Sequence, residues 1–409
     1  MLYALRKGPD CDDQAMTPGF NSQPERVLML SKDPTLLSDR AGFGDTLARH
    51  IVYAKRLQAE RPGSELRILT YSKKGAESQK LSPVKGLEIY GTQSRYRLFF
   101  GLDALACLRQ VLAGGWWPTV VTTQEPWEDG QLGLWLANRY DARFVPQLHF
   151  DLLSVDWLRE HPLNRLKAFI ARRTLKQASA VRVVSTVQKE KLMRSLSIAA
   201  ERIHVIPVGV SFQPTAKTKA LCKSALSKDL TGHPVVLFVG RLCTQKNLPL
   251  WLEVAYQVHA QAPDTRFVIA GDGHMRANIQ QAVCAKGLDA AFLFLGNVDY
   301  QDLPEVYGAA DVFLLTSDYE GFGRVIVEAY LAGVPVVATI CTGPEDIIVE
   351  GKTGYLCPTG DGKKLAEATL SLLQNPEKRS AFGRLGQQHV RDWFGRDRLT
   401  RLLIQLWTA

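Results

Sequence analysis

Short apolar, β-branched runs alternate along the whole chain with longer amphipathic stretches, a pattern typical of α/β proteins with parallel sheets. The runs predicted as strands are 26–31, 65–72, 87–91, 119–124, 142–149, 180–186 and 204–209 in the first half, and 234–240, 266–271, 291–296, 311–317, 334–339 and 353–358 in the second. The stretches predicted as helices include 42–60, 128–139, 163–178, 248–260, 301–309, 323–332 and 362–373.

The two series of strands predict two doubly wound, Rossmann-like domains, because 409 residues are too many for one core of ordinary size. The polar, poorly periodic segment 210–234 is the best linker candidate. We expect a first domain over 1–212, a second over 213–390, and a C-terminal helix in 391–409 that packs back on the first domain. Ligands of such sheets bind at the carboxyl ends of the strands, in a cleft where two domains face each other.

The excess of positive charge lies in the first half of the chain. Residues 1–213 hold 30 Lys and Arg against 21 Asp and Glu, whereas residues 214–409 hold 20 of each kind. A basic half suggests an anionic partner, such as a membrane surface, a phosphorylated substrate or nucleic acid, or only a soluble surface with surplus basic residues. No nucleic-acid motif accompanies the charge, so we expect no nucleic-acid partner.

Several features favour the cytoplasm. The seven cysteines are scattered and form no C-x-x-C, so neither a disulfide framework nor a zinc site is indicated. The first 25 residues lack the apolar core of a signal peptide, and no apolar run reaches the length of about 18 residues that spans a bilayer.

Two further segments leave alternatives open. The segment 95–118 sets basic residues beside aromatic ones, which fits an interfacial membrane segment as well as a core helix with tryptophans packed beneath it. If it is interfacial, the protein contacts the inner face of the membrane and releases from it in high salt. Asp10-Cys11-Asp12 is a D-x-D of the kind that can hold a divalent metal, but it precedes the first strand, and we expect no metal in the site.

The segment "SDYEGFGRVIVEAYLAG" (317–333) places two glutamates near a predicted strand end. Gly321 and Gly323 lie between a strand and a helix, where free backbone N–H groups and the helix dipole suit a phosphate. Glu320 can bind a ligand there or only complement the dipole. Glu328 lies in an apolar run, so its carboxylate needs hydrogen-bond partners, either from a ligand or from within the domain.

Two more loops follow strands of the same predicted domain. "GRLCTQKN" brings Gly240, Arg241 and Lys246 to the end of the strand 234–240. "GDGH" begins at Gly271, the last residue of the strand 266–271, and also allows a ligand to approach the backbone closely. Glycine-bearing loops with two cations and a helix N-terminus together predict a diphosphate site.

The combination resembles a known family. "VGRLCTQKN", "IAGDGHM", "FLGNV" and "SDYEGFGRVIVEAYLAGVPVVAT", followed by "GPEDIIVEGKTGYL", are similar to the donor half of the retaining glycosyltransferases of family 4, which have the GT-B fold. The resemblance is strong over about 234–375 and fainter over 26–210.

The resemblance implies a nucleotide-sugar donor, of the UDP, GDP or ADP kind. Arg241 and Lys246 would neutralise its diphosphate. Glu320 would hold the transferred sugar, and Glu328 would accept hydrogen bonds from the ribose hydroxyls. The donor-binding backbone would come from Gly240, Gly271, Gly296, Val298, Gly321, Phe322 and Gly323, with Gly296–Val298 against the nucleobase.

In the first half the resemblance implies fewer residues. His149, which ends a strand, would lie beside the transferred sugar, and Gly42 and Gly44 would form a loop near the donor phosphate and the acceptor. Phe43 between these glycines departs from the usual adjacent pair and weakens the phosphate assignment. Val208 replaces the asparagine usual before Gly209 in a loop at the expected hinge.

The implied activity is a retaining, metal-independent transfer of a hexose, without a cofactor, to a sugar, a lipid-linked sugar or a polysaccharide precursor. Two alternatives remain. One is a nucleotide-sugar-binding protein without turnover, and the other is a sugar phosphorylase or a sucrose-type synthase on the same fold.

Overall fold

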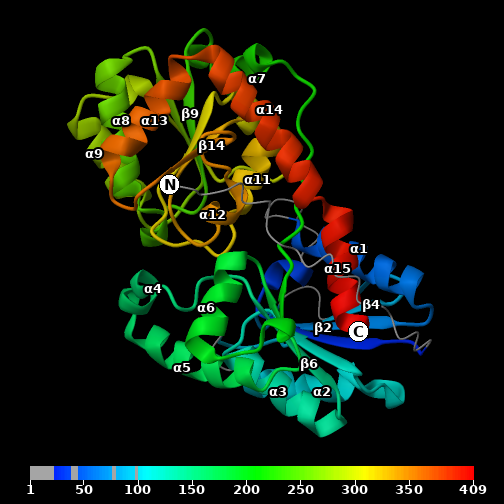
Figure 1. Ribbon diagram of the computed structural model, residues 1–409. Helices are drawn as coiled ribbons and strands as arrows, with labels where there is room; N and C mark the ends of the chain where they lie inside the picture. The colour runs from blue at the N-terminus through cyan, green and yellow to red at the C-terminus, as the bar shows by residue number, and fades with distance from the viewer. Residues whose placement is uncertain (1–22, 38–44, 76–79, 97–99) are drawn as a thin grey trace. The chain divides into compact units, whose positions relative to one another are not determined.

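The computed structural model describes residues 23–37, 45–75, 80–96 and 100–409. The described chain forms two compact units (Figure 1). The N-terminal unit ends at Gly209 and also contains Arg396–Ala409, and the C-terminal unit is Val210–Gly395. Both are α/β with parallel sheets, which confirms the fold class predicted from the alternating pattern.

Within the described residues, the N-terminal unit has an eight-stranded sheet in the order β3-β4-β2-β1-β5-β6-β7-β8. All neighbouring strands are parallel except β3 and β4. The strands are β1 (Arg26–Ser31), β2 (Glu65–Thr70), β3 (Lys80–Val84), β4 (Leu87–Gly91), β5 (Val120–Thr123), β6 (Arg143–Leu148), β7 (Val181–Val183) and β8 (Ile203–Val205). The helices are α1 (Thr46–Glu60), α2 (Phe100–Val111), α3 (Glu128–Tyr140), α4 (Val155–Glu160), α5 (Pro162–Lys176), α6 (Thr186–Leu196) and α15 (Arg396–Thr408).

The C-terminal helix α15 is part of the core of the N-terminal unit. The Trp407 ring is fully buried and lies edge-on to Tyr53 of α1, with ring centroids 6.1 Å apart. Arg143 donates hydrogen bonds from its guanidinium to the carbonyl oxygens of Leu406 and Trp407, each at 3.2 Å. Cations on the last carbonyls of a helix satisfy acceptors that the helix itself leaves free, so this helix end is fixed.

In the described residues of the C-terminal unit, six parallel strands have the order β11-β10-β9-β12-β13-β14. The strands are β9 (Val235–Val239), β10 (Arg266–Ala270), β11 (Phe292–Gly296), β12 (Val312–Leu315), β13 (Val336–Thr339) and β14 (Gly354–Cys357). The helices are α7 (Lys219–Leu226), α8 (Leu248–Gln261), α9 (Arg276–Ala285), α10 (Leu303–Ala309), α11 (Arg324–Leu331), α12 (Pro344–Ile347), α13 (Gly362–Leu373) and α14 (Pro376–Trp393).

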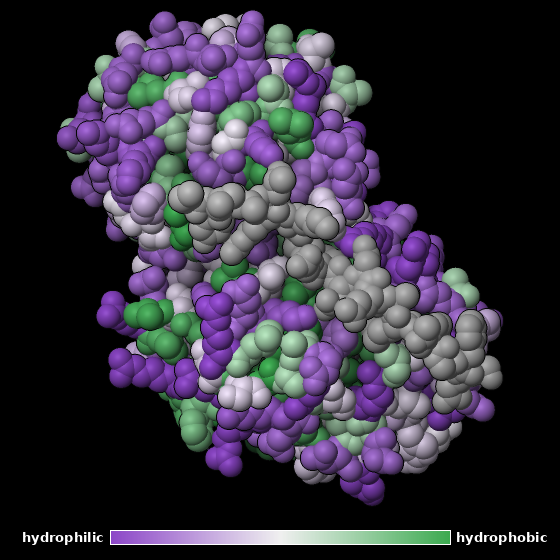
Figure 2. All heavy atoms as spheres, viewed as in Figure 1, coloured by the Kyte–Doolittle hydropathy of each residue, from purple (hydrophilic) through white to green (hydrophobic). Residues whose placement is uncertain are grey.

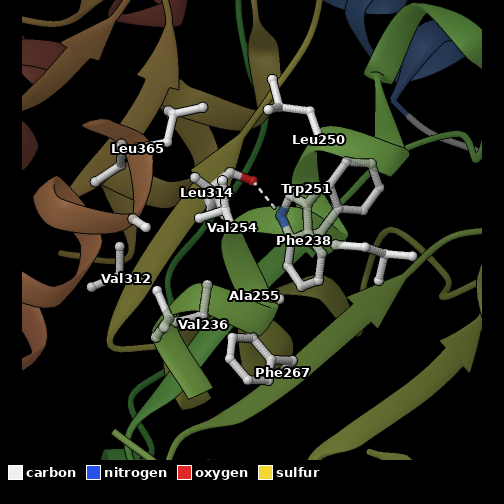
Figure 3. Packing of buried hydrophobic residues seen from close by; sticks show 14 of the residues in the cluster. Val236, Phe238, Leu250, Trp251, Val254, Ala255, Phe267, Val312, Leu314 and Leu365 are labelled. Carbon is white, nitrogen blue, oxygen red and sulfur yellow. Dashed lines mark hydrogen bonds between the residues drawn. The ribbon is translucent and has the colours of Figure 1, made fainter. Parts of the chain in front are cut away.

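Trp251 of α8 is a central residue of the core between α8 and this sheet (Figure 3). Its ring lies edge-on to Phe238 and to Phe267, with centroids 6.1 Å apart in each case. Its indole N–H donates to the carbonyl oxygen of Leu314 in β12 at 3.1 Å. The tryptophan therefore packs as an apolar side chain without leaving its donor unpaired, and it ties α8 to β12.

The segment 210–234 is not a featureless linker, because it contains α7. Lys219 and Lys223 of α7 bind the buried carboxylate of Asp311, just before β12, at 2.9 and 2.8 Å. Burial raises the pKa of the Asp311 carboxyl, but the two lysines outweigh burial and hold that pKa below its ordinary value. The polar residues that suggested a linker are thus the ones that attach α7 to the sheet.

Two other segments of the N-terminal unit can be compared with what the sequence predicted. The edge strand β3 was not predicted, because its sequence contains Pro83 and only one face is covered. Within the segment 95–118, Phe100–Val111 form α2, with Ala104 and Leu108 buried. Trp116 is buried against Arg67, whose guanidinium lies 4.5 Å from the centroid of the Trp116 ring. One face of this helix is therefore packed in the core, whereas Leu102, Leu105 and Trp117 are exposed, so the two alternatives for the segment both stay predictions.

Candidate active site

Two loops of the C-terminal unit, 240–247 after β9 and 316–323 after β12, are joined by hydrogen bonds. The strands β9 and β12 are parallel neighbours, so their carboxyl ends meet at one edge of the sheet. Gln245 accepts from the Asp318 N–H at 3.0 Å, and its side-chain amide donates to the Tyr319 carbonyl at 2.9 Å. The two loops therefore form one structure.

At the centre of the joined loops lies an ion pair between Lys246 and Glu320. The Lys246 Nζ contacts Glu320 Oε1, and the Ser317 hydroxyl donates to the same oxygen at 2.9 Å. Each of the two charged residues is only 8% exposed. The residue predicted for the diphosphate and the residue predicted for the sugar are thus in direct contact.

The burial of this pair is not explained by stability alone. Removing two charges from water costs several kcal/mol each, and apolar residues of similar volume often stabilise a fold as well or better. Charged groups kept in such surroundings are frequent at functional sites. The pair is therefore the strongest indication of chemistry at this edge of the sheet.

Three glycines lie at the ends of the neighbouring strands β9, β10 and β11. Gly240, Gly271 and Gly296 have φ of +153°, +139° and +68°, and they follow or end β9, β10 and β11. A Cβ on Gly271 would lie 1.9 Å from the Gly240 carbonyl oxygen, so no other residue fits there. These strand ends consequently keep bare backbone where the sequence predicts that a ligand approaches.

The N-terminus of α11 completes this group of loops. Gly323 has φ +91° and stands before the first helical residue, Arg324. The Phe322 side chain is buried against the Phe394 ring, with centroids 5.5 Å apart, so Phe322 can offer a ligand its backbone but not its ring. The free N–H groups of the first turn and the positive end of the helix dipole suit an anion.

Glu328 lies one turn further along α11 and is 4% exposed. Tyr307 of α10 donates its hydroxyl to Glu328 Oε2 at 2.9 Å, and an Arg324 nitrogen lies 3.8 Å from Oε1. Burial, with the charge of Glu328 added, raises the pKa of the Tyr307 hydroxyl well above its ordinary value, so this hydroxyl remains a donor. The Glu328 carboxylate can lie in an apolar run because Tyr307 and Arg324 of the protein are its partners. The binding of ribose by Glu328 stays a prediction.

Arg241 differs from Lys246 in its surroundings, since its side chain is exposed. Among the described residues it makes no ion pair. A cation in water next to Gly240 is available to an anionic ligand without breaking an internal contact.

Val298, predicted at the nucleobase, is half-buried in the loop after β11.

His149 belongs to the N-terminal unit and directly follows β6. Burial, with the nearby charges of Arg182 and Arg49, lowers the pKa of its imidazole well below the ordinary value. The ring is therefore neutral near pH 7, and a neutral imidazole can donate one hydrogen bond and accept another. Such a group suits contact with sugar hydroxyls. Gly42 and Gly44 lie outside the described residues.

Two residues that contact the predicted site residues were not predicted from the sequence. Tyr307 is 21 positions from Glu328, and no local pattern links the two. Ser317 is part of the segment 317–333. Its position three residues before Glu320 could have indicated that its hydroxyl donates to that carboxylate. In the described ranges, no three His, Cys, Asp or Glu side chains come together as ligands of a metal ion, and Asp10 and Asp12 lie outside those ranges.

Comparisons with known proteins define the class. The structure superposes on sucrose-phosphate synthase from Thermosynechococcus elongatus with a TM-score of 0.80, at 22% identity, covering 94% of this chain and 98% of the other. It superposes on Anabaena HepE in complex with UDP-glucose with a TM-score of 0.72, at 19% identity, covering 94% and 100%. The fold is therefore GT-B, as the resemblance implied.

Sequence comparison gives the family. Residues 226–389 match "Glycosyl transferases group 1", and residues 49–209 match "Glycosyl transferase 4-like domain". A GDP-mannose-dependent alpha-mannosyltransferase of Mycobacterium tuberculosis is 30% identical over 66% of this chain and 70% of its own. The alpha-D-kanosaminyltransferase of Streptomyces kanamyceticus is 28% identical over 58% of this chain, and the match spans 66% of that relative. The chain belongs to the group 1 glycosyltransferases.

The Lys246–Glu320 pair yields a first prediction. Lys246→Met should destabilise the fold by about 3–5 kcal/mol, because it leaves Glu320 buried and uncompensated. The double variant Lys246→Met/Glu320→Gln buries no unpaired charge, so its stability should return to within about 1 kcal/mol of wild type. Its sugar transfer should nevertheless stay about 100-fold or more below wild type, because both groups are predicted to bind the donor. Urea unfolding and transfer kinetics measure the two effects.

Two controls accompany this pair of variants. Arg241→Ala removes an exposed cation, so it should slow transfer and leave stability unchanged. Lys363→Met removes a lysine that is 83% exposed elsewhere in the same unit and should change neither quantity. If transfer recovers together with stability in the double variant, the pair is structural only.

Glu328 and its partner yield a second prediction. Glu328→Gln should weaken binding of the matching nucleoside diphosphate by about 10- to 100-fold and raise the donor KM, because it removes a charged acceptor from ribose. Glu320→Gln should instead lower kcat, since Glu320 is assigned to the reacting sugar. Tyr307→Phe is the matched control: it removes the internal hydrogen bond of Glu328 and should change the melting temperature alone. Unchanged nucleotide affinity in Glu328→Gln, measured by calorimetry, would end the ribose assignment.

Proposed function

We propose that this chain transfers a hexose, with retention of anomeric configuration and without a metal or cofactor, from a nucleotide sugar to an acceptor. The acceptor is a sugar, a lipid-linked sugar or a polysaccharide precursor, and the setting is the cytoplasm, at the inner face of the membrane. The observation that carries the proposal is the buried Lys246–Glu320 pair, set among bare glycine strand ends and the N-terminus of α11.

Each part of the donor has a place at this edge of the sheet. Arg241, Lys246 and the first turn of α11 receive the diphosphate, because positive charge there opposes the charge that grows on the leaving group. Glu320 holds the sugar and Glu328 the ribose. The backbone of Gly296–Val298 faces the nucleobase. The assignment of His149 of the N-terminal unit to the transferred sugar comes from the family resemblance alone.

The reaction breaks the bond from C1 of the sugar to the diphosphate and forms a bond from C1 to an acceptor oxygen on the same face. Because both groups share that face, a departing phosphate oxygen is the nearest base for the acceptor proton. No side chain of the described site stands out as a covalent nucleophile. The demand on the protein is electrostatic, and the cations and the helix dipole meet it without a bound metal.

The names of similar proteins support a nucleotide-sugar donor and differ in the nucleotide. One relative is named for GDP-mannose, and one solved structure holds UDP-glucose. Each of these compounds joins a sugar, a diphosphate, a ribose and a base. The four places described above fit that common plan.

The test begins with thermal shift against UDP-, GDP- and ADP-sugars. We expect one nucleotide to stabilise the protein clearly more than the other two, by the free energy of its binding. With that donor and a mixture of soluble and lipid-linked acceptors, the nucleoside diphosphate should be released at the same rate in EDTA, and the product should keep the donor's anomeric configuration by NMR. Stabilisation without release in any acceptor mixture would instead support the binding-protein alternative. Formation of a sugar 1-phosphate from an oligosaccharide and orthophosphate, without a nucleotide sugar, would support a phosphorylase.

A further inference from the structure

Four large apolar side chains are exposed on the consecutive helices α4 and α5 of the N-terminal unit. Val155 of α4 and Leu163, Leu166 and Phe169 of α5 are each 54–55% exposed. Single exposed apolar residues are ordinary, but several on one short stretch of surface mark a place where something binds. None of these four residues belongs to the site described above.

The opposite face of α5 is fixed in the core, so these residues cannot turn inward. Asn164 is buried and donates its side-chain amide to the Trp157 carbonyl at 2.8 Å. Ala168, Ala171 and Leu175 are buried on the same face. Leu163, Leu166 and Phe169 recur every third residue on the other side of the helix, as neighbours along its surface.

The exposed apolar residues are accompanied by positive charge. Residues 155–176 contain six Lys and Arg against two Asp and Glu, and α5 contains no acidic residue. Arg165, Arg172 and Lys176 are exposed and lie along one flank of the apolar row. Arg173 lies over the exposed Phe169 ring at 5.6 Å. In Figure 2, hydrophobic and hydrophilic side chains lie side by side on the surface over α4 and α5.

We propose that α4 and α5 form a lipid-docking surface that seats this protein on an anionic bilayer. A row of apolar side chains flanked by basic ones is the pattern of a helix lying in the membrane interface, with its apolar side among the acyl chains and its cations at the phosphates. A basic flank without acidic residues on α5 matches a uniformly negative plane.

The lipid-docking surface says which residues would make the membrane contact of the proposed function. It rests on the proposed function only for the choice of a lipid-linked acceptor. It is separate from the segment 95–118, in which Trp116 is buried whereas Leu102 and Trp117 are 67% and 50% exposed. Its test needs no sugar donor, so docking and transfer can fail separately.

The experiment is sedimentation of the full chain with vesicles of equimolar phosphatidylglycerol and phosphatidylcholine, and with vesicles of phosphatidylcholine alone. Wild type should pellet with the anionic vesicles only and release in high salt. Leu163→Ser/Leu166→Ser/Phe169→Ser should bind at least about tenfold more weakly. Arg165→Gln/Arg172→Gln/Lys176→Gln should lose about fivefold per charge and show a weaker salt dependence.

The matched control is Leu221→Ser/Leu385→Ser, which changes two apolar residues of the C-terminal unit that are 59% and 52% exposed. It should bind vesicles as wild type does. Every variant should keep the wild-type melting temperature and its transfer to a soluble acceptor.

Three results would overturn the lipid-docking surface. The first is wild type that does not distinguish anionic from neutral vesicles. The second is wild-type binding by the triple serine variant. The third is a wild-type dimer in light scattering that this variant converts to monomers, which would make the surface an interface between copies.

Discussion

The candidate site depends on one buried ion pair, Lys246 with Glu320. Each charge has left water, and each would be strongly destabilising without the other. The pair therefore requires the loops after β9 and β12 to stay together, and the hydrogen bonds of Gln245 with Asp318 and Tyr319 serve the same end. A ligand at this edge meets a preformed arrangement, so little of its binding energy is spent on ordering the loops.

The rest of the C-terminal unit supports this arrangement from below. Trp251 ties α8, which follows the first loop, to β12, which precedes the second. Asp311, held by Lys219 and Lys223, fixes the opposite end of β12. The backbone at Gly240 and Gly271 is so close that no side chain fits between them, which keeps this edge of the sheet free of side chains at that point.

Much of this was predictable from the sequence, because strand ends in a parallel sheet meet at one edge and the loops carry glycines and cations. The direct contact of Lys246 with Glu320 was not, since side-chain pairing across 74 residues leaves no local pattern. Tyr307 escaped for the same reason. The helix α7 was not predicted, because its lysines are typical of a solvated linker. The exposed apolar row on α5 was not predicted either, because an apolar residue in a helical pattern indicates burial. The sequence did contain one indication of the exposed row: its apolar residues recur every third position on a helix whose other face is already apolar and buried.

Hydrogen–deuterium exchange of the wild-type protein with and without the matching nucleoside diphosphate tests the central claim most directly. The claim is that the loops after β9, β10 and β12 and the start of α11 form one diphosphate site. We expect slower exchange of backbone amides at 240–247, 271–276 and 316–328 together, and a smaller effect from the nucleoside without phosphates. Bound nucleotide that leaves these three segments unchanged, or protects them equally without its phosphates, would contradict it.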